Sequence, residues 1–187
     1  MVGGEVGHEN IKAWGKLMIT IREERPEDTK AVREVYIGAF GQELEADLVD
    51  QMRQRCDDLL ALVAVMEGRI VGHILFSPAV IERRKQTVYG MALAPMAVLP
   101  EYQRQGIGSQ LVQAGIEALK QVECPFIILV GLPTYYPRFG FEPASRYKIR
   151  SEWAVPRDAF MVLVLDEQQK DALSGVAKYR PEFSEVV

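Results

Sequence analysis

The chain has few of the residues that build metal centres and disulfide-bonded scaffolds. Only two cysteines and two histidines occur among its 187 residues. His8 and His73 lie too far apart in the sequence to suggest a metal site, so we expect no metal. Cys56 and Cys124 lack Cys-x-x-Cys spacing and lie in apolar contexts. We expect both to be reduced, buried thiols of a cytoplasmic protein, and not a disulfide or a nucleophile.

Long apolar runs and a strong excess of one charge are also missing. No apolar run has the length that crosses a membrane, and the N-terminal residues show no apolar signal-peptide core. The formal net charge of −4 argues mildly against nucleic acid as the main partner. Arg83, Arg84 and Lys85 form a basic run without aromatic neighbours, which is typical of a solvated turn. We therefore expect neither a membrane nor nucleic acid as a partner.

The apolar content is sufficient for one folded domain with a substantial core. Hydrophobic residues make up 48% of the chain, which argues against overall disorder. Residues 1–16 are rich in glycine and polar residues without a period, and we expect a flexible tail there. Residues 17–167 carry the periodic apolar patterns of a single domain. Residues 168–187 are more polar, and we expect a C-terminal tail that packs on the domain.

Apolar spacing predicts helices near the N-terminus and strands in the middle of the chain. One helix is expected where apolar residues recur at helical spacing: Val32, Val35, Tyr36 and Ala39. A second helix is expected where three apolar residues share a face: Leu44, Leu48 and Met52. Strands are expected over residues 60–66, 69–76, 87–98, 126–130 and 160–165, and a third helix over 106–121. The strand–helix–strand order from residue 87 to 130 predicts a parallel pair with a right-handed crossover.

Proline and glycine mark the most informative part of the chain. Pro95 interrupts the strand expected over residues 87–98, and because proline cannot donate to a ladder, it predicts a bulge or an open edge. Directly after this strand, Gln103-x-x-Gly106-x-Gly108 opens the third helix. Amides at a helix N-terminus attract phosphate oxygens, and glycine removes the Cβ atoms that would keep them away. We therefore expect the chain to hold a ligand that carries a diphosphate.

These features together resemble the GNAT superfamily of acyl-CoA-dependent N-acetyltransferases. The order of elements and the Gln-x-x-Gly-x-Gly turn are similar to those of the family. Residues 93–98, Leu-Ala-Pro-Met-Ala-Val, resemble its bulged strand. Residues 135–141, Tyr-Tyr-Pro-Arg-Phe-Gly-Phe, resemble its aromatic-Tyr-x-x-x-Gly-Phe segment. The resemblance covers residues 19–165.

The resemblance implies a specific architecture. The expected fold class is α/β (α+β), a single domain with a mixed, mostly antiparallel sheet, a bulged central strand and helices on both faces. Residues 71–77, Val-Gly-His-Ile-Leu-Phe-Ser, are similar to those of a branch of predicted bacterial N-acetyltransferases whose substrates are mostly unassigned. A member of this family is expected to be an enzyme whose acceptor is an amine.

The resemblance also implies acetyl-CoA as the cosubstrate. It would be held by the end of the bulged strand and by the glycine turn, at Met96, Ala97, Val98, Gln103, Arg104, Gln105, Gly106, Ile107, Gly108 and Ser109. The amides of residues 104–109 would hold the pyrophosphate, and one N–H of the strand would face the thioester oxygen. For Gln103 a simple turn role is the alternative, and for Arg104 a solvent-facing one.

For the chemistry, the resemblance implies direct transfer of the acetyl group to a primary amine of a small molecule or peptide. Tyr136 occupies the position where the family commonly has its general acid, which protonates the departing thiolate. Tyr135 is the alternative acid, and Tyr136 could instead pack against the cofactor or the core. Cys56 and Cys124 have no setting for a nucleophile, which disfavours a covalent acyl-enzyme.

The general base and the partners stay open at this point. Glu43, Glu45 and Asp47 are candidate bases, although a solvated acidic helix start explains them more simply. Arg138 could contact a carboxylate or the ribose phosphate of the cofactor, and His73 is expected to have a structural partner in a strand. A non-catalytic acyl-CoA-binding sensor is the alternative function. Because the family often dimerises, a homodimer is also possible.

Overall fold

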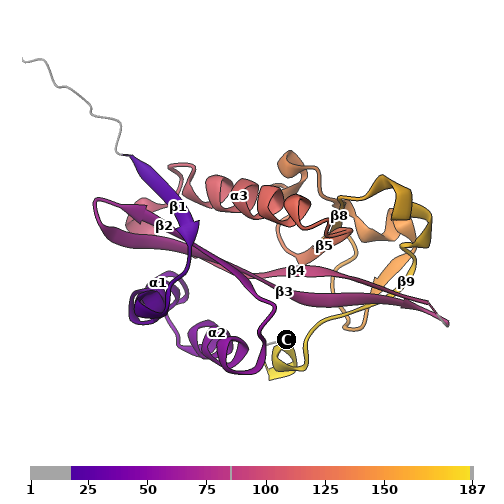
Figure 1. Ribbon diagram of the computed structural model, residues 1–187, viewed down its shortest axis with the longest axis horizontal. Coiled ribbons are helices and arrows are strands. Elements are labelled where there is room, and N and C mark those ends of the chain that lie inside the picture. The colour runs from indigo at the N-terminus through magenta and orange to yellow at the C-terminus, as the bar shows by residue number, and fades with distance from the viewer. Residues whose placement is uncertain (1–17, 85, 186–187) are drawn as a thin grey trace, which may run out of the picture.

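The computed structural model describes residues 18–84 and 86–185, and the residues expected to form the flexible N-terminal tail lie outside this range. Figure 1 shows a twisted sheet with helices on both faces. In chain order the strands are β1 (Ile19–Glu23), β2 (Leu60–Met66), β3 (Arg69–Arg83), β4 (Gln86–Val98), β5 (Phe126–Val130), β6 (Glu142–Pro143), β7 (Ile149–Ser151), β8 (Phe160–Val164) and β9 (Gly175–Lys178). The main helices are α1 (Thr29–Phe40), α2 (Leu44–Arg55) and α3 (Ile107–Gln121).

The sheet is mixed and mostly antiparallel, as the sequence predicted. Its strand order is β1-β2-β3-β4-β5-β8-β6, and β9 joins β3 and β7. Strand β4 runs parallel to β5, and α3 connects the two, so the predicted parallel crossover is confirmed. Strand β7 pairs with β9 in parallel, and the remaining neighbours are antiparallel.

Strand β4 carries a bulge at the predicted proline. On β3, Ile74 pairs with Met96 and Phe76 pairs with Leu93. Two residues of β4, Ala94 and Pro95, therefore lie opposite one residue of β3. The inference from Pro95 is confirmed, because a bulge places proline where no ladder bond is needed.

Two helical layers cover the sheet, and Figure 1 shows α3 on one face and α1 with α2 on the other. Under α3, Leu111 of the helix lies in one buried cluster with Ile127 and Leu129 of β5. Under α1 and α2, Val32 and Met52 belong to a second cluster that also contains side chains of β2, β3 and β4. A third cluster fills the same face as α1 and α2, beneath the segments that follow β5.

Two predicted details of these elements were wrong. Leu44, expected on the buried face of the second helix, is 42% exposed. The buried stripe of α2 runs through Ala46, Leu48, Val49 and Met52 and leaves the first residue of the helix outside. The strand predicted to stop at residue 76 continues to Arg83, because β3 pairs with both β4 and β9 beyond that point.

The C-terminal residues contribute a strand to the sheet. In β9, Lys178 pairs with Val80 and Ala177 pairs with Ile81. Phe183 is buried in the cluster under α1 and α2. Residues 168–187, predicted as a tail that packs on the domain, therefore add a strand to the sheet and a side chain to the core under α1 and α2.

Candidate functional site

Strands β4 and β5 separate at the middle of the sheet. They pair only at Met91 with Ile127 and at Ala92 with Ile128. Beyond Ala92, β4 continues to Val98 without a strand partner on its β5 side in the described part of the chain. This edge is a row of backbone donors and acceptors that a ligand can use.

The turn that opens α3 has a glycine at its N-cap and leaves several backbone amides without a carbonyl partner in the part of the chain that the structure describes. Gly106 is the N-cap residue and has a φ of +85°, a left-handed conformation that favours glycine. A Cβ atom on Gly108 would lie 2.9 Å from the hydroxyl oxygen of Tyr135. Across the described residues, the amides of residues 104–109 donate to no backbone carbonyl. These free amides at the positive end of a helix dipole form a site for an anion.

A cavity of about 780 Å³ joins the open edge of β4 to this turn. Every residue expected to bind the cofactor lines it except Gln105, whose side-chain amide instead donates to the carbonyl oxygen of Glu101 at 3.1 Å. The side-chain amide of Gln103 donates to the carbonyl oxygen of Val98 at 2.9 Å. Gln103 therefore ties the end of β4 to the glycine turn. The cavity is bordered by the open backbone of β4 and by the free amides of the α3 turn, which fits a cosubstrate with a diphosphate and an extended arm.

Comparison with known protein families identifies an acetyltransferase (GNAT) domain over residues 20–144. The chain belongs to the GNAT acetyltransferase family. This GNAT domain includes the bulge of β4, the glycine turn and β5, so the site lies within the part that defines the family.

Individual relatives agree with this assignment. The GNAT chain is 42% identical over 120 residues to the uncharacterized N-acetyltransferase YjhQ of Escherichia coli strain K12, a match that covers 63% of this chain and 66% of the relative. It is 32% identical over 165 residues to the uncharacterized N-acetyltransferase YhbS of the same strain, covering 88% of this chain and 98% of that protein.

Two solved structures share the fold at similar identity. The structure of YhbS from Escherichia coli in complex with CoA has a TM-score of 0.82 at 30% identity, covering 90% of this chain and 93% of that one. A GNAT acetyltransferase from Brucella melitensis in complex with acetyl-CoA has a TM-score of 0.71 at 31% identity, covering 89% and 98%.

The GNAT cavity has four further lining residues: Tyr102, Leu132, Tyr135 and Arg138. The sequence left two of them open, Arg138 as a contact of the cofactor and Tyr135 as the alternative acid. The guanidinium of Arg138 lies 4.7 Å from the ring centroid of Tyr135 and donates to its carbonyl oxygen at 2.9 Å. Both residues belong to the segment that resembles the family's Tyr-x-x-x-Gly-Phe, which was the available signal. Nothing in the local sequence pattern marks Tyr102 or Leu132.

Tyr136, the expected general acid, packs behind Tyr135. The two rings meet edge to face with centroids 5.0 Å apart, and the ring of Phe141 is 5.8 Å from that of Tyr136. A Cβ atom on Gly131, just after β5, would lie 2.3 Å from the Tyr136 ring. The Tyr136 hydroxyl has no hydrogen-bond partner among residues 18–84 and 86–185. Burial, with a smaller effect of Tyr135, raises the pKa of Tyr136 to about 12 and keeps it protonated.

The acidic residues considered as bases have other partners. Arg33 pairs with both Glu43 and Asp47 at 2.7 Å. Glu45 accepts from the side-chain amide of Gln42 at 3.1 Å. None of the three acids lines the GNAT cavity. All three acids lie at or just before the start of α2, as expected for a solvated acidic helix start. The described structure therefore identifies no base among them.

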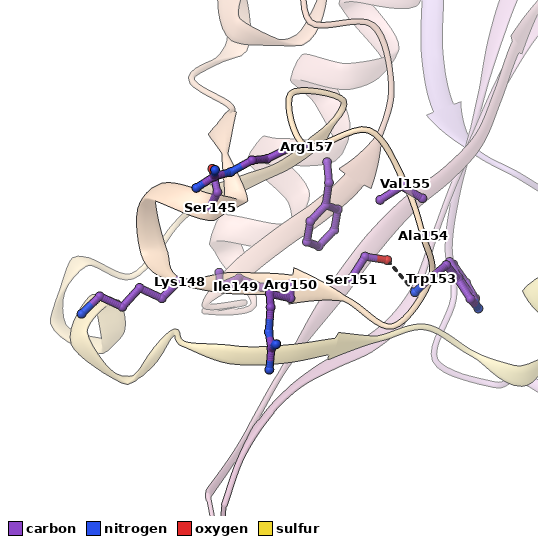
Figure 2. A pocket seen from close by; sticks show the side chains of 10 residues that line it. Ser145, Lys148, Ile149, Arg150, Ser151, Trp153, Ala154, Val155 and Arg157 are labelled. Atoms are coloured by element: carbon purple, nitrogen blue, oxygen red, sulfur yellow. Dashed lines mark hydrogen bonds between the residues drawn. The ribbon is translucent and has the colours of Figure 1, made fainter.

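A second cavity, of about 580 Å³, lies in the segment between β6 and β8 (Figure 2). Its lining includes Ile149, Trp153, Ala154, Val155 and Phe160. In Figure 2 the side chain of Arg157 extends toward Ser145, whereas Lys148 and Arg150 point away from the strand. Phe160 begins β8 and pairs with Val130, the last residue of β5. This cavity therefore begins one strand away from the point where β4 and β5 separate.

The described helices give no indication of a membrane segment. None of those in residues 18–84 and 86–185 combines the length and the apolar character needed to span a bilayer.

Proposed function

We propose that this protein is an acetyl-CoA-dependent N-acetyltransferase that transfers the acetyl group directly to a primary amine in a ternary complex. The observation that carries the proposal is the single cavity that runs from the open edge of β4 to the free amides of the α3 turn. Two solved structures that are 30% and 31% identical to this chain contain CoA and acetyl-CoA, which supports the same ligand here.

The cavity supplies a distinct group for each part of such a cosubstrate. The amides of residues 104–109 bind the pyrophosphate at the N-terminus of α3, where Tyr135 and Arg138 line the wall. The open edge at Met96 and Val98 binds the pantetheine arm by backbone hydrogen bonds. No metal ion is needed for any of these contacts.

Acetyl-CoA brings an acyl group that is already activated as a thioester. We propose that an amide of the open β4 edge donates to the thioester oxygen, which favours the charge that develops there. The amine nitrogen bonds to the carbonyl carbon as the carbon–sulfur bond breaks, and Tyr136 donates its hydroxyl proton to the departing sulfur. With its pKa raised to about 12, Tyr136 is a weaker acid than a thiol, so the proton moves only as the carbon–sulfur bond breaks. The proton that the amine loses passes to water, from which Tyr136 regains its own.

Direct transfer is favoured over a covalent acyl-enzyme. Burial raises the pKa of Cys124, and its thiol donates to the carbonyl oxygen of Phe126 at 3.2 Å. Neither Cys124 nor Cys56 lines the cavity proposed for acetyl-CoA. A thiol that is buried as its neutral form, away from the thioester, is a poor nucleophile.

We propose that the amine enters through the second cavity (Figure 2). The first cavity lies beside α3, and its apolar residues Met96, Val98 and Ile107 belong to the cluster on that face. Ile149 and Phe160 of the second cavity belong to a cluster on the opposite face. An amine that arrives there approaches the carbonyl from a side that the leaving thiol does not occupy.

The test has a binding step and a turnover step. Isothermal titration calorimetry with acetyl-CoA is expected to show one site per chain, and a free-thiol assay over a panel of amines is expected to show release of CoA. Binding with turnover supports the enzyme. Binding without turnover on any amine supports the alternative, a non-catalytic acyl-CoA sensor. A chain that does not bind acetyl-CoA contradicts both.

A further inference from the structure

A buried chain of polar side chains lies against the bulge of β4, on the face that α1 covers. The hydroxyl oxygen of Tyr36 is 3.0 Å from the carbonyl oxygen of Pro95 and 2.8 Å from Nδ1 of His73. Nε2 of His73 is 3.3 Å from a carboxylate oxygen of Glu24, which also pairs with Arg53. Tyr36 and His73 are both 0% exposed. Tyr36 of α1 and His73 of β3 therefore form a buried pair that reaches the bulge, and Glu24 and Arg53 lie next to it.

The direction of these hydrogen bonds follows from the groups involved. A carbonyl oxygen only accepts, so Tyr36 is the donor to Pro95. Tyr36 has one hydroxyl hydrogen, and His73 must therefore donate from Nδ1 to the Tyr36 oxygen. Burial lowers the pKa of His73 more than Glu24 raises it, so the imidazole is neutral and Nε2 carries no hydrogen. Nε2 then has no hydrogen to give the Glu24 carboxylate oxygen 3.3 Å away, so Arg53, and not His73, is the donor from which Glu24 accepts.

The bulge needs such a partner because it interrupts the ladder. Ala94 and Pro95 lie opposite a single residue of β3, so the regular exchange of backbone hydrogen bonds stops there. A buried carbonyl without a donor costs free energy and does not hold one orientation. The Tyr36 hydroxyl supplies the donor from the α1 side, and His73 holds the hydroxyl in place. The residues that follow the bulge, Met96 and Val98, are those of the open edge.

We propose that Tyr36 and His73 are positioning residues that hold the β4 bulge in the orientation from which its edge binds acetyl-CoA. The inference rests on the function proposed for that edge. Neither side chain lines the cosubstrate cavity, so both act through the backbone of β4. Loss of the Tyr36 hydroxyl leaves the ring in place and releases the Pro95 carbonyl.

The first test measures the backbone directly, in the free protein. Tyr36→Phe is expected to speed amide hydrogen exchange across residues 91–98, and the rest of the sheet is expected to exchange as before. Val49→Ala is the matched control, because Val49 is 0% exposed in the same core cluster but belongs to α2. The control is expected to lower the melting temperature without this local change. Equal exchange in Tyr36→Phe and the wild type overturns the proposal.

The second test measures the consequence for the ligand. By calorimetry, Tyr36→Phe is expected to weaken acetyl-CoA binding by about tenfold, because the open edge is no longer preorganised. Val49→Ala is expected to bind as the wild type does. Equal losses in the two variants would mean that Tyr36 acts only through overall stability, which overturns the proposal.

The third test separates the role of His73 from simple packing. His73→Asn keeps a polar amide near the position of Nδ1, and His73→Leu fills similar space without one. Exchange across residues 91–98 is expected to be near the wild-type rate in His73→Asn and fast in His73→Leu. The same rate in both variants contradicts the role of His73.

The two proposals fail in distinguishable ways. If the wild type binds acetyl-CoA but acetylates no amine, the proposed catalysis fails, and the exchange and binding tests still decide the role of Tyr36. If the wild type turns over and Tyr36→Phe matches it in exchange, binding and kcat, the positioning role alone is wrong.

Discussion

The hydroxyl oxygen of Tyr135 lies 3.5 Å from the hydroxyl oxygen of Ser109, in the first turn of α3. This contact places Tyr135 where the free amides of the turn would bind phosphate. Tyr136, one residue further, packs instead between Tyr135 and Phe141, next to Gly131 at the end of β5. We therefore expect Tyr135 to contribute to binding of acetyl-CoA and Tyr136 to the transfer step. Substitutions at Tyr135 are expected to change the Kd for acetyl-CoA, and those at Tyr136 to change kcat.

Tyr136→Phe is expected to lower kcat and leave the Kd for acetyl-CoA nearly unchanged. The loss is on the order of 10²-fold, because general-acid help is limited when the acid has a high pKa. Tyr135→Phe is the matched control and is expected to raise the Kd for acetyl-CoA with little effect on kcat at saturation. Steady-state kinetics and calorimetry on both variants measure this split. The reverse split would move the acid role to Tyr135.

The pH dependence of kcat gives an independent check on Tyr136. Burial raises its pKa to about 12, so the proton that it donates is present at neutral and moderately alkaline pH. The rate is therefore expected not to fall through loss of this proton until the pH nears about 12. A kcat profile with saturating amine measures it. A decline at lower pH that Tyr136→Phe abolishes would show that the acid titrates earlier.

Gly106→Ala is expected to damage both stability and acetyl-CoA binding. Gly106 has a φ of +85°, and an L-residue in this region costs about 1–2 kcal/mol of the free energy of unfolding. Gly41, the C-cap of α1, has a φ of +73° and similarly open surroundings, so Gly41→Ala is the matched control. Both variants are expected to have a lower melting temperature than the wild type, but only Gly106→Ala is expected to bind acetyl-CoA more weakly. If the two variants bind acetyl-CoA equally well, the turn at Gly106 does not contact the ligand.

The backbone of the site was more predictable from sequence than its side-chain contacts. Pro95 acts through its own backbone, so the bulge could be predicted locally, and the glycines predicted amides exposed at the start of a helix, whereas the left-handed φ of Gly106 was not predicted. The contact from Tyr36 to Pro95 joins residues 59 apart and depends on how α1 packs on the sheet. Helical spacing placed Tyr36 on a buried face, but no local pattern identifies what its hydroxyl meets.

The wrong predictions concern the limits of elements. Periodicity shows which residues of a helix share a face, but it does not show how far the core extends beneath it. Leu44 shares a side of α2 with buried residues and still lies outside the core. The strand predicted over residues 69–76 ends too early, because pairing with β4 and β9 carries β3 on to Arg83. Both errors have the same origin, since tertiary neighbours decide where an element stops.

Acidification below neutral pH is expected to destabilise the protein through His73. Burial lowers the pKa of His73 below its ordinary value of 6.5, so the unfolded chain gains a proton before the folded one does. The stability present above pH 6.5 is therefore lost as the pH falls through that value and toward the lower folded pKa. Glu24 has a lowered pKa and adds a loss at more acidic pH, below about 4.5. Melting temperatures between the two values are expected to fall less steeply in His73→Asn, and an unchanged slope would contradict this origin.

The proposed acceptor cavity can be tested by filling it without removing any packed side chain. Ala154 lines the cavity from an exposed position, so Ala154→Trp adds bulk there at little cost to folding. We expect the KM for the amine to rise at least about tenfold, since the added ring occupies space that the amine needs to bind. The Kd for acetyl-CoA is expected to stay the same, because its cavity lies beside α3. Gln113→Trp adds the same bulk on the exposed side of α3 and is expected to change neither constant. If Ala154→Trp also leaves the amine KM unchanged, the acceptor binds elsewhere, and the direction of attack proposed from the second cavity is wrong.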